Sequence, residues 1–223
     1  MRLIVSNNYS EIFRLLEKAI EEFNEIPVHK KEVPRMGIVG EIYAKYNYFA
    51  NQDLVHWLIG QGIEPVLPPI VDYFIQDLVN YKENIKANIR RRKLADLLGY
   101  AIERLVMDYH GKINFLFSKF RHGLPFDDIK QVAKKASKIL TMTHQFGEGW
   151  LVPGEIATFA EQGIHHVISL QPFGCIANHI ISKGVETKIK SVYPDMNVYS
   201  LDFDAGMSEA NIRNRLHFMI ENL

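Results

Sequence analysis

The sequence predicts an α/β fold: a small parallel sheet of the flavodoxin-like or Rossmann-like kind, with a helical insertion. Short apolar runs at residues 35–40, 64–67, 167–170 and 197–201 have the length and composition of buried strands. Segments with helical spacing of apolar residues alternate with these runs, which is the order of βαβ units. Between about residues 71 and 140 the strand signal fades and helical windows dominate. We therefore expect one α/β domain over residues 1–223, with 71–140 as the insertion.

The first part of the chain reads as an amphipathic helix followed by a βαβ unit. Apolar residues recur at helical spacing over about 9–24, with charged residues on the other face. A strand at 35–40, a loop at 41–48, a helix at about 51–60 and a strand at 64–67 follow. Gly62 closes the helix, and Pro68 and Pro69 end the second strand.

The middle third is predicted to be helical over 71–81, 85–109 and 126–140. The basic run from Arg90 to Lys93 would then lie on a helix. A run of this kind is usually a solvated helix face, and a site for a phosphate-bearing ligand is the alternative.

The last third returns to the α/β pattern. A helix over 153–161 leads to the strand that ends at Leu170, and a turn containing Cys175 opens a helix that reaches about Tyr193. A further strand at 197–201 and a final helix from about Ser208 to Ile220 complete the chain. Parallel strands followed by loops rich in polar residues place a candidate site at the carboxyl edge of the sheet.

Composition excludes several classes of function. The 223 residues contain 26 Lys and Arg against 26 Asp and Glu, so no overall positive charge attracts nucleic acid. The single cysteine excludes an internal disulfide framework and a zinc knuckle within one chain. The amino terminus turns polar too early for a signal peptide, and no apolar run is long enough to span a membrane. We expect a cytoplasmic protein that binds neither nucleic acid nor membrane.

Cys175 is the first candidate for chemistry, because it stands between a strand and the start of a helix. Backbone N–H groups and the helix dipole favour a thiolate at such a position. A lone cysteine is also frequently a small buried apolar residue, so a structural role stays open. His179 follows four residues later on the same predicted helix face, which allows a nucleophile–base pair as a further alternative.

Polar residues after the other strands extend this candidate edge. Glu41 follows a strand and could bind a polar substrate group, or cap the next segment. Asp202 and Asp204 lie on one side of the chain by strand alternation, and suit either Mg²⁺ through water or a turn. If the strands share one sheet, Glu41, Cys175 and Asp202 converge on one crevice. The predicted ligand edge comprises Gly40, Glu41, Tyr43, Asn51, Glu148, Trp150, Asn178, His179, Asp202 and Asp204.

Four motifs in order resemble one protein family from about residue 35 to the end. They are Gly40-Glu41-Ile42-Tyr43 with Asn51; Glu148-Gly149-Trp150-Leu151 with Gly154-Glu155; Gln171-Pro172-Phe173-Gly174-Cys175 with Asn178-His179 and Lys183-Gly184; and Asp202-Phe203-Asp204 with Ser208-Glu209, Asn211 and Arg213. This set resembles the carboxyl-terminal region of CoA-substrate-specific enzyme activases and activase-related acyl-CoA dehydratases. That region is similar in turn to subunits of 2-hydroxyacyl-CoA dehydratases and benzoyl-CoA reductases.

The resemblance implies a dehydratase-like module of such an activase system, associated with iron–sulfur-dependent electron transfer to acyl-CoA chemistry. It implies an ATP-hydrolysing activase as partner, an acyl-CoA ligand and no activity of the chain alone. The chain would be either a fragment of a longer protein or a reduced stand-alone form, and its single cysteine fits a cluster bridged across a homodimer. Cys175 would be an iron–sulfur ligand. A [4Fe–4S] cluster usually needs four thiolates, so its other ligands would come from outside this chain.

The sequence departs from the family pattern at Ala177, where proline is common. Two other interpretations of the chain stay open. One is a docking or scaffold domain with a structural Cys175. The other is a domain that binds a small molecule at the Glu41/Asp202 edge.

Overall fold

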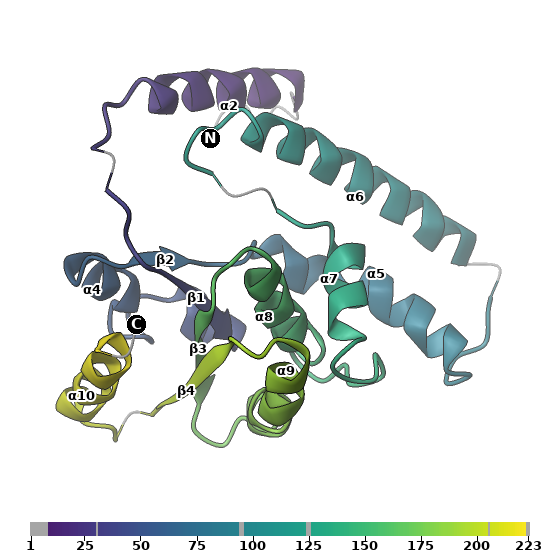
Figure 1. Cartoon of the computed structure of the whole chain (residues 1–223). Coiled ribbons are helices and arrows are strands. Elements are labelled where there is room, and N and C mark those ends of the chain that lie inside the picture. Colours follow the sequence, from purple (N-terminus) through teal and green to yellow (C-terminus); the bar gives the residue numbers. More distant parts are fainter. Residues whose placement is uncertain (1–8, 30, 94–95, 124–125, 205, 222–223) are drawn as a thin grey trace. The chain divides into compact units, whose positions relative to one another are not determined.

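A computed structural model describes residues 9–29, 31–93, 96–123, 126–204 and 206–221 (Figure 1). The chain divides into two compact units, one from residues 1–31 and 93–128 and the other from residues 32–92 and 129–223. The predicted insertion is thus shared between the units, because the helices around residues 71–86 and 129–136 belong to the second unit. Each unit is described by itself.

The first unit is built on two long helices, α2 (Tyr9–Asn24) and α6 (Asp96–Phe117). The predicted helix at 9–24 is therefore confirmed. The Phe13 ring stacks on Tyr109 with centroids 6.1 Å apart, and Phe23 meets Phe120 edge-on at 6.3 Å. Because Phe13 contacts the middle of α6 and Phe23 contacts Phe120, just beyond its end, the two helices run in the same direction. Asn24 ties their ends together by donating from Nδ2 to the Lys119 carbonyl over 2.8 Å.

The second unit contains a four-stranded, all-parallel sheet. Its strands are β1 (Arg35–Gly40), β2 (Glu64–Val66), β3 (His166–Pro172) and β4 (Asn197–Phe203), in the order β2-β1-β3-β4. Met36 pairs with His166 and Gly40 with Leu170 in the register between the central strands. This order is that of the first four strands of flavodoxin-like sheets, in which the chain switches direction between β1 and β3. The predicted α/β fold class is confirmed.

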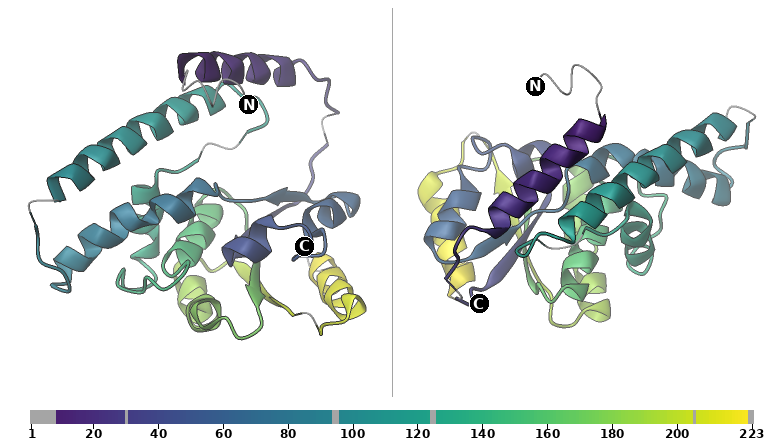
Figure 2. Two further views of the ribbon diagram at one scale, coloured as in Figure 1. Left: turned by 180° about the vertical axis from the view of Figure 1, so that it is seen from behind. Right: turned by 90° about the horizontal axis from the view of Figure 1, so that it is seen from above.

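The central strands β1 and β3 form because their apolar runs are buried on both faces, as parallel sheets require. Ile38 and Ile168 belong to the core cluster on one face, Val39 and Val167 point to the other face by strand alternation, and all four have almost no exposed surface. Helices α4 (Leu54–Gly60) and α10 (Glu209–Ile220) cover one face, where Leu58 and Leu216 join the core cluster. Helices α8 (Leu151–Glu161) and α9 (Glu186–Val192) lie on the other face (Figures 1 and 2). The sheet is therefore covered from both sides.

Two further helices, α5 (Val71–Lys86) and α7 (Ile129–Ala136), pack beside α8 in this unit. α5 ends at Lys86, and Asn88 then takes a left-handed backbone conformation with φ of 59°. The expectation of one helix over 85–109 is therefore wrong, since α6 begins only at Asp96. The basic run from Arg90 to Lys93 is exposed but lies between helices instead of on one.

The carboxyl ends of β1 and β3 are followed by short helical segments. The predicted loop at 41–48 contains a five-residue helix, α3 (Ile42–Tyr46). The predicted helix after Cys175 is a π-helix, η1 (Asn178–Lys183), followed by α9. A Cβ on Gly184 would lie 2.0 Å from the Ile180 carbonyl oxygen, so only glycine fits where this wide turn ends. π-helical turns are rare and occur frequently at functional sites.

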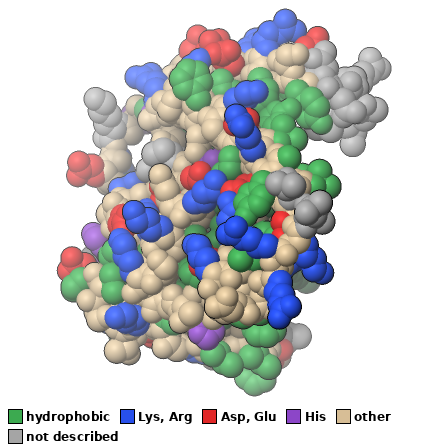
Figure 3. All heavy atoms as spheres, turned by 90° about the vertical axis from the view of Figure 1, so that its right-hand side faces the viewer, with side chains coloured by type: hydrophobic (Ala, Val, Ile, Leu, Met, Phe, Trp, Pro, Cys, Tyr) green, Lys and Arg blue, Asp and Glu red, His purple; other side chains and the backbone are tan. Residues whose placement is uncertain are grey.

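Basic side chains are frequent on the face shown in Figure 3, with acidic groups interspersed among them. Within the described residues, no helix is both long enough and apolar enough to cross a bilayer.

Candidate functional site

The four sequence motifs meet at the carboxyl edge of the parallel sheet. The backbone N–H of Glu41 donates to the Leu170 carbonyl over 2.9 Å, which joins the first motif to the strand of the third. The Ile42 N–H donates to Glu148 Oε1 over 2.9 Å, which joins the first motif to the second. Gln171 is linked in turn to Asp202 of the fourth motif. Segments separated by more than a hundred residues therefore form one edge.

Gly40 makes this approach of β1 to β3 feasible. Its φ is +114°, and a Cβ there would lie 2.0 Å from the Leu170 carbonyl oxygen. Any other residue would be both strained and in collision with backbone. The contribution of Gly40 to the edge is therefore close backbone packing.

Glu41 caps α3, which was one of its two predicted roles. Its Oε2 accepts a hydrogen bond from the Ala44 N–H over 2.8 Å. Tyr43 is exposed on the same turn. Asn51 is buried and braces the segment, because its Nδ2 donates to the Ala44 carbonyl over 2.9 Å and its Oδ1 accepts from the Leu54 N–H over 3.3 Å. Asn51 is thus a support for the edge, and no hydrogen bond of Glu41 Oε1 is found among the described residues.

A buried ion pair lies beneath α3. Lys45 Nζ donates to both carboxylate oxygens of Glu155, over 2.9 and 3.1 Å, and both side chains are almost completely buried. Burial raises the pKa of the Glu155 carboxyl, Lys45 opposes that rise, and the nearby Glu148 adds to it. Burial, together with the charges of Glu155 and Asp72, also raises the pKa of the Tyr46 phenol. This pair anchors α3 to α8.

Trp150 is fully buried, so it is a core residue and does not offer a stacking surface to a ligand. Its Nε1 donates to Asn80 Oδ1 over 2.6 Å. Glu148 is also buried, and it accepts the Ile42 N–H described above. The second motif therefore fixes the loop before α8 against α3 and α5.

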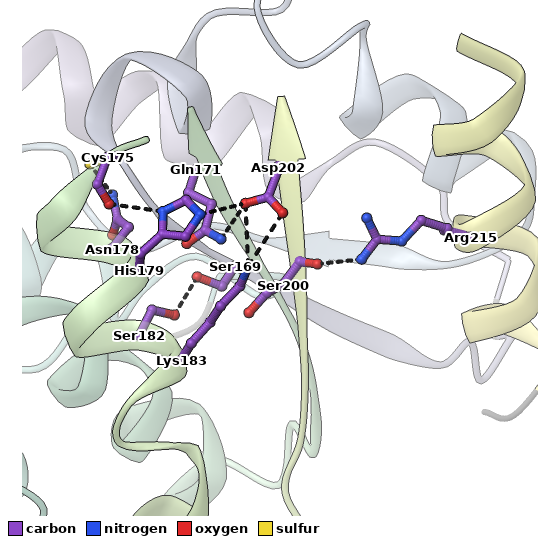
Figure 4. Close-up of polar contacts among 10 residues, drawn as sticks. All are labelled: Ser169, Gln171, Cys175, Asn178, His179, Ser182, Lys183, Ser200, Asp202 and Arg215. Carbon is purple, nitrogen blue, oxygen red and sulfur yellow. Dashed lines mark hydrogen bonds and ion pairs between the residues drawn. The ribbon is translucent and has the colours of Figure 1, made fainter. Parts of the chain in front are cut away.

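A polar cluster joins the ends of β3 and β4 (Figure 4). Gln171 Nε2 donates to Asp202 Oδ1 over 2.5 Å, and Lys183 Nζ lies 3.3 Å from Asp202 Oδ2. His179 Nε2 is 3.3 Å from Asp202 Oδ1. Burial acts to raise the pKa of Asp202, but the hydrogen bonds from Gln171 and Lys183 and the nearby charges outweigh it, and the pKa is lowered. Asp202 is thus held as a carboxylate by its neighbours.

His179 and Cys175 do not form a nucleophile–base pair. His179 Nδ1 lies 2.9 Å from the Cys175 carbonyl oxygen, to which it donates, and Nε2 faces Asp202. Neither ring nitrogen faces the sulfur in Figure 4. Asn178 is buried, and its Nδ2 lies 3.4 Å from Cys175 Sγ. The half-buried thiol is held by a turn and by the Asn178 amide, and the described residues place no base beside it.

The residues of this chain do not fit an iron–sulfur cluster by themselves. Cys175 is the one cysteine of the sequence. In the part of the chain that the structure describes, no group of three or more His, Cys, Asp and Glu side chains could hold a metal ion. A [4Fe–4S] cluster usually takes four cysteine thiolates.

A pocket opens at the switch point between β1 and β3. Its volume is about 470 Å³, and it lies between the loops that follow β1, β3 and β4. Asp204 and Glu41 line it, whereas Asp202 and Cys175 do not. The prediction that Glu41, Cys175 and Asp202 line one crevice is thus wrong, because only Glu41 of the three lines this pocket. The lining comprises Glu41, Tyr43, Ala44, Phe49, Ala50, Gln52, Pro172, Phe203, Asp204 and Met207.

Large exposed apolar side chains surround this edge, and we call them the apolar rim. They are the five most exposed large hydrophobic residues among those described, each between 73% and 84% accessible: Tyr48, Phe49, Phe146, Phe173 and Ile176. The loops that carry them are adjacent. Phe49 and Pro172 line the same pocket, and a Cβ on Gly147 would lie 3.4 Å from Ala177. Sequence reasoning missed the rim, because exposure is not encoded in apolar residue type.

No protein-family model, no curated protein and no solved structure matches the chain.

Proposed function

We propose that the chain is a binding module whose working surface is the carboxyl edge of the sheet. In this proposal the edge docks a partner protein of a CoA-substrate-specific enzyme activase system, which the four motifs suggest, and the chain has no catalytic activity alone. The ATP-hydrolysing activase is the proposed partner. On this proposal the chain is a dehydratase-like module that binds its partner and does not catalyse a reaction by itself.

One observation carries the proposal: the apolar rim lies on the edge that the four motifs build. Contiguous exposed apolar side chains are uncommon on monomeric proteins and mark interaction sites. Interfaces are enriched in aromatic residues, and four of the five rim residues are aromatic. The Lys45–Glu155 pair and the Gln171–Asp202 bond hold the loops that carry the rim.

The contacts within the edge favour binding over catalysis. Asp202 is bound by Gln171, Lys183 and His179, and in the part of the chain that the structure describes no base lies beside the Cys175 thiol. A nucleophile needs an activating partner within hydrogen-bond reach. An acyl-CoA, if it enters the assembly, would on this proposal be bound together with the partner.

Hydrogen exchange tests the location of docking. The chain would be incubated with a purified activase-type ATPase, and backbone exchange followed by mass spectrometry. We expect protection at 41–52, 144–150 and 171–180. Protection confined to other segments, or none at saturating partner, would contradict the proposal.

A further inference from the structure

We propose that the pocket at the β1/β3 switch point binds an organic cation, an ammonium or guanidinium group carried on an apolar stem. The inference deepens the proposed function by naming the chemistry that the docking edge accepts. It depends on the proposed function only in that both use the same edge of the sheet. The pocket is lined by Glu41 and Asp204, by aromatic side chains and by small apolar residues.

The polar groups of the pocket carry negative charge or accept hydrogen bonds. Glu41 Oε2 accepts from the Ala44 N–H, and no hydrogen bond or ion pair is found for Oε1 within the described residues. The Asp204 carboxylate likewise has no hydrogen-bonded or ion-paired partner in the described part of the chain. None of the described residues that line the pocket is Lys, Arg or His. The Arg213 guanidinium donates to the backbone carbonyl of Gln52 over 2.9 Å, and it is paired with Glu209 at 3.6 Å. The two carboxylates of the lining therefore still make the potential there negative and attract a positive ligand.

A third hydrogen-bond acceptor belongs to the lining of the pocket. Gln52 lines the pocket, and its Oε1 is buried with no hydrogen-bond partner among the described residues. Leaving a buried acceptor unsatisfied is costly. This oxygen has no surface open to the pocket, so a ligand donor would satisfy it only after the Gln52 side chain turned toward the ligand. An ammonium or guanidinium group offers several N–H donors and no acceptor, which matches the chemistry of this lining.

The aromatic and apolar walls distinguish an organic cation from a hydrated metal ion. Tyr43 and Phe49 are 61% and 82% exposed and line the pocket together with Phe203. Aromatic faces attract ammonium and guanidinium groups, and Pro172 and Met207 supply apolar contact for a stem. No group of three metal-ligating side chains is found in the described residues. The pocket volume of about 470 Å³ lies in the range of small-molecule sites.

The same lining argues against the phosphates of coenzyme A in this pocket. Each phosphate would approach Glu41 and Asp204 without a basic residue from the lining to receive it. Like charges in such proximity repel. Coenzyme A is therefore an informative negative probe, and a basic group is the expected occupant.

The test is a calorimetric titration of the whole chain with agmatine, with N-acetyl-lysine amide, and with coenzyme A. We expect saturable binding of the cations, weakened by salt, and none of coenzyme A. Glu41→Gln and Asp204→Asn should each weaken cation binding about tenfold. Glu41→Gln keeps an acceptor for the Ala44 N–H, so the cap survives. Asp195→Asn, an exposed change of equal charge at the other edge of the sheet, is the matched control and should bind as wild type.

The outcomes show whether the cation is a free small molecule or a side chain of a partner. They also distinguish failure of this inference from failure of the docking proposal. Preference for agmatine indicates a free amine or guanidine, whereas preference for the amino-acid amide indicates a basic side chain of a partner. Absence of saturable cation binding, or equal binding by all three variants, would overturn the inference. Cation binding without partner protection in hydrogen exchange would overturn only the docking proposal, and the converse result would overturn only this one.

Discussion

Lys45 and Glu155 are 110 residues apart in sequence and form a bidentate ion pair inside the protein, with Nζ–O distances of 2.9 and 3.1 Å. The pair connects α3 to α8 directly below the Glu41 turn. Because the pair lies under the candidate edge, we expect the loss of either buried charge to destabilise that edge.

Removing one partner of this pair should destabilise the fold strongly. Glu155→Leu leaves the Lys45 ammonium buried without its carboxylate, which costs about 3–5 kcal/mol. Lys45→Met combined with Glu155→Leu removes both charges and should recover most of that loss. Denaturant unfolding of the two single variants and the double variant measures this. Additive losses in the double variant would contradict the coupling.

Gly40 should be intolerant of a side chain. Gly40→Ala places Cβ 2.0 Å from the Leu170 carbonyl at a φ of +114°, so β1 would separate from β3. We expect a loss of about 3 kcal/mol or more, or failure to fold. The matched control is Gly60→Ala, where no atom lies within 4 Å of the added Cβ and helix α4 gains up to about 1 kcal/mol. Equal unfolding midpoints for both variants would refute this role.

Asp202 should contribute stability that depends on pH. Its folded-state pKa is lowered despite burial, because Gln171 and Lys183 bind the carboxylate. The unfolded pKa is about 3.9, so the contribution is fully present above that pH and is lost as pH falls through the lower folded value.

Asp202→Asn tests this linkage. Wild type should be more stable than the variant by about 1 kcal/mol at neutral pH. The difference should shrink below about pH 4, as measured by urea unfolding across pH. A difference that grows on acidification would have the wrong sign.

Cys175 should behave as a structural thiol in the isolated chain. After anaerobic reconstitution with iron and sulfide, wild type and Cys175→Ala should both contain far less than one cluster per chain, since one cysteine cannot supply four thiolates. Iron and acid-labile sulfide assays give the content. Stoichiometric iron in wild type that disappears in the variant would restore Cys175 as a cluster ligand.

Much of the fold follows from local sequence. The strand runs are apolar and bounded by Gly, Pro or polar residues, and all four strands are found where predicted. The prediction of one helix over 85–109 failed for a local reason: Asn88 adopts a left-handed backbone conformation, which the spacing of apolar residues does not reveal. The pairing of α2 with α6 depends on contacts such as Phe13–Tyr109, almost a hundred residues apart.

The candidate site was predicted in outline but not in its contacts. Strand ends identified Glu41, Cys175 and Asp202 as edge residues, which parallel topology makes reasonable. Their partners are distant in sequence, so the Lys45–Glu155 pair and the Gln171–Asp202 bond could not be inferred. Strand alternation predicted that Asp202 and Asp204 share one side of the chain. β4 ends at Phe203, however, so Asp204 lies beyond the strand and lines the pocket, whereas Asp202 does not.

The affinity of the proposed partner for rim variants is the most direct measurement of the central claim. A purified activase-type ATPase would be titrated against wild type, Phe49→Ser with Phe173→Ser, and Phe218→Ser. Phe218 lies on α10, is 68% exposed and serves as the matched control. The account predicts that the double rim variant binds about tenfold or more weakly while the Phe218 variant matches wild type. Equal affinity for all three proteins would contradict the claim that this edge is the docking surface.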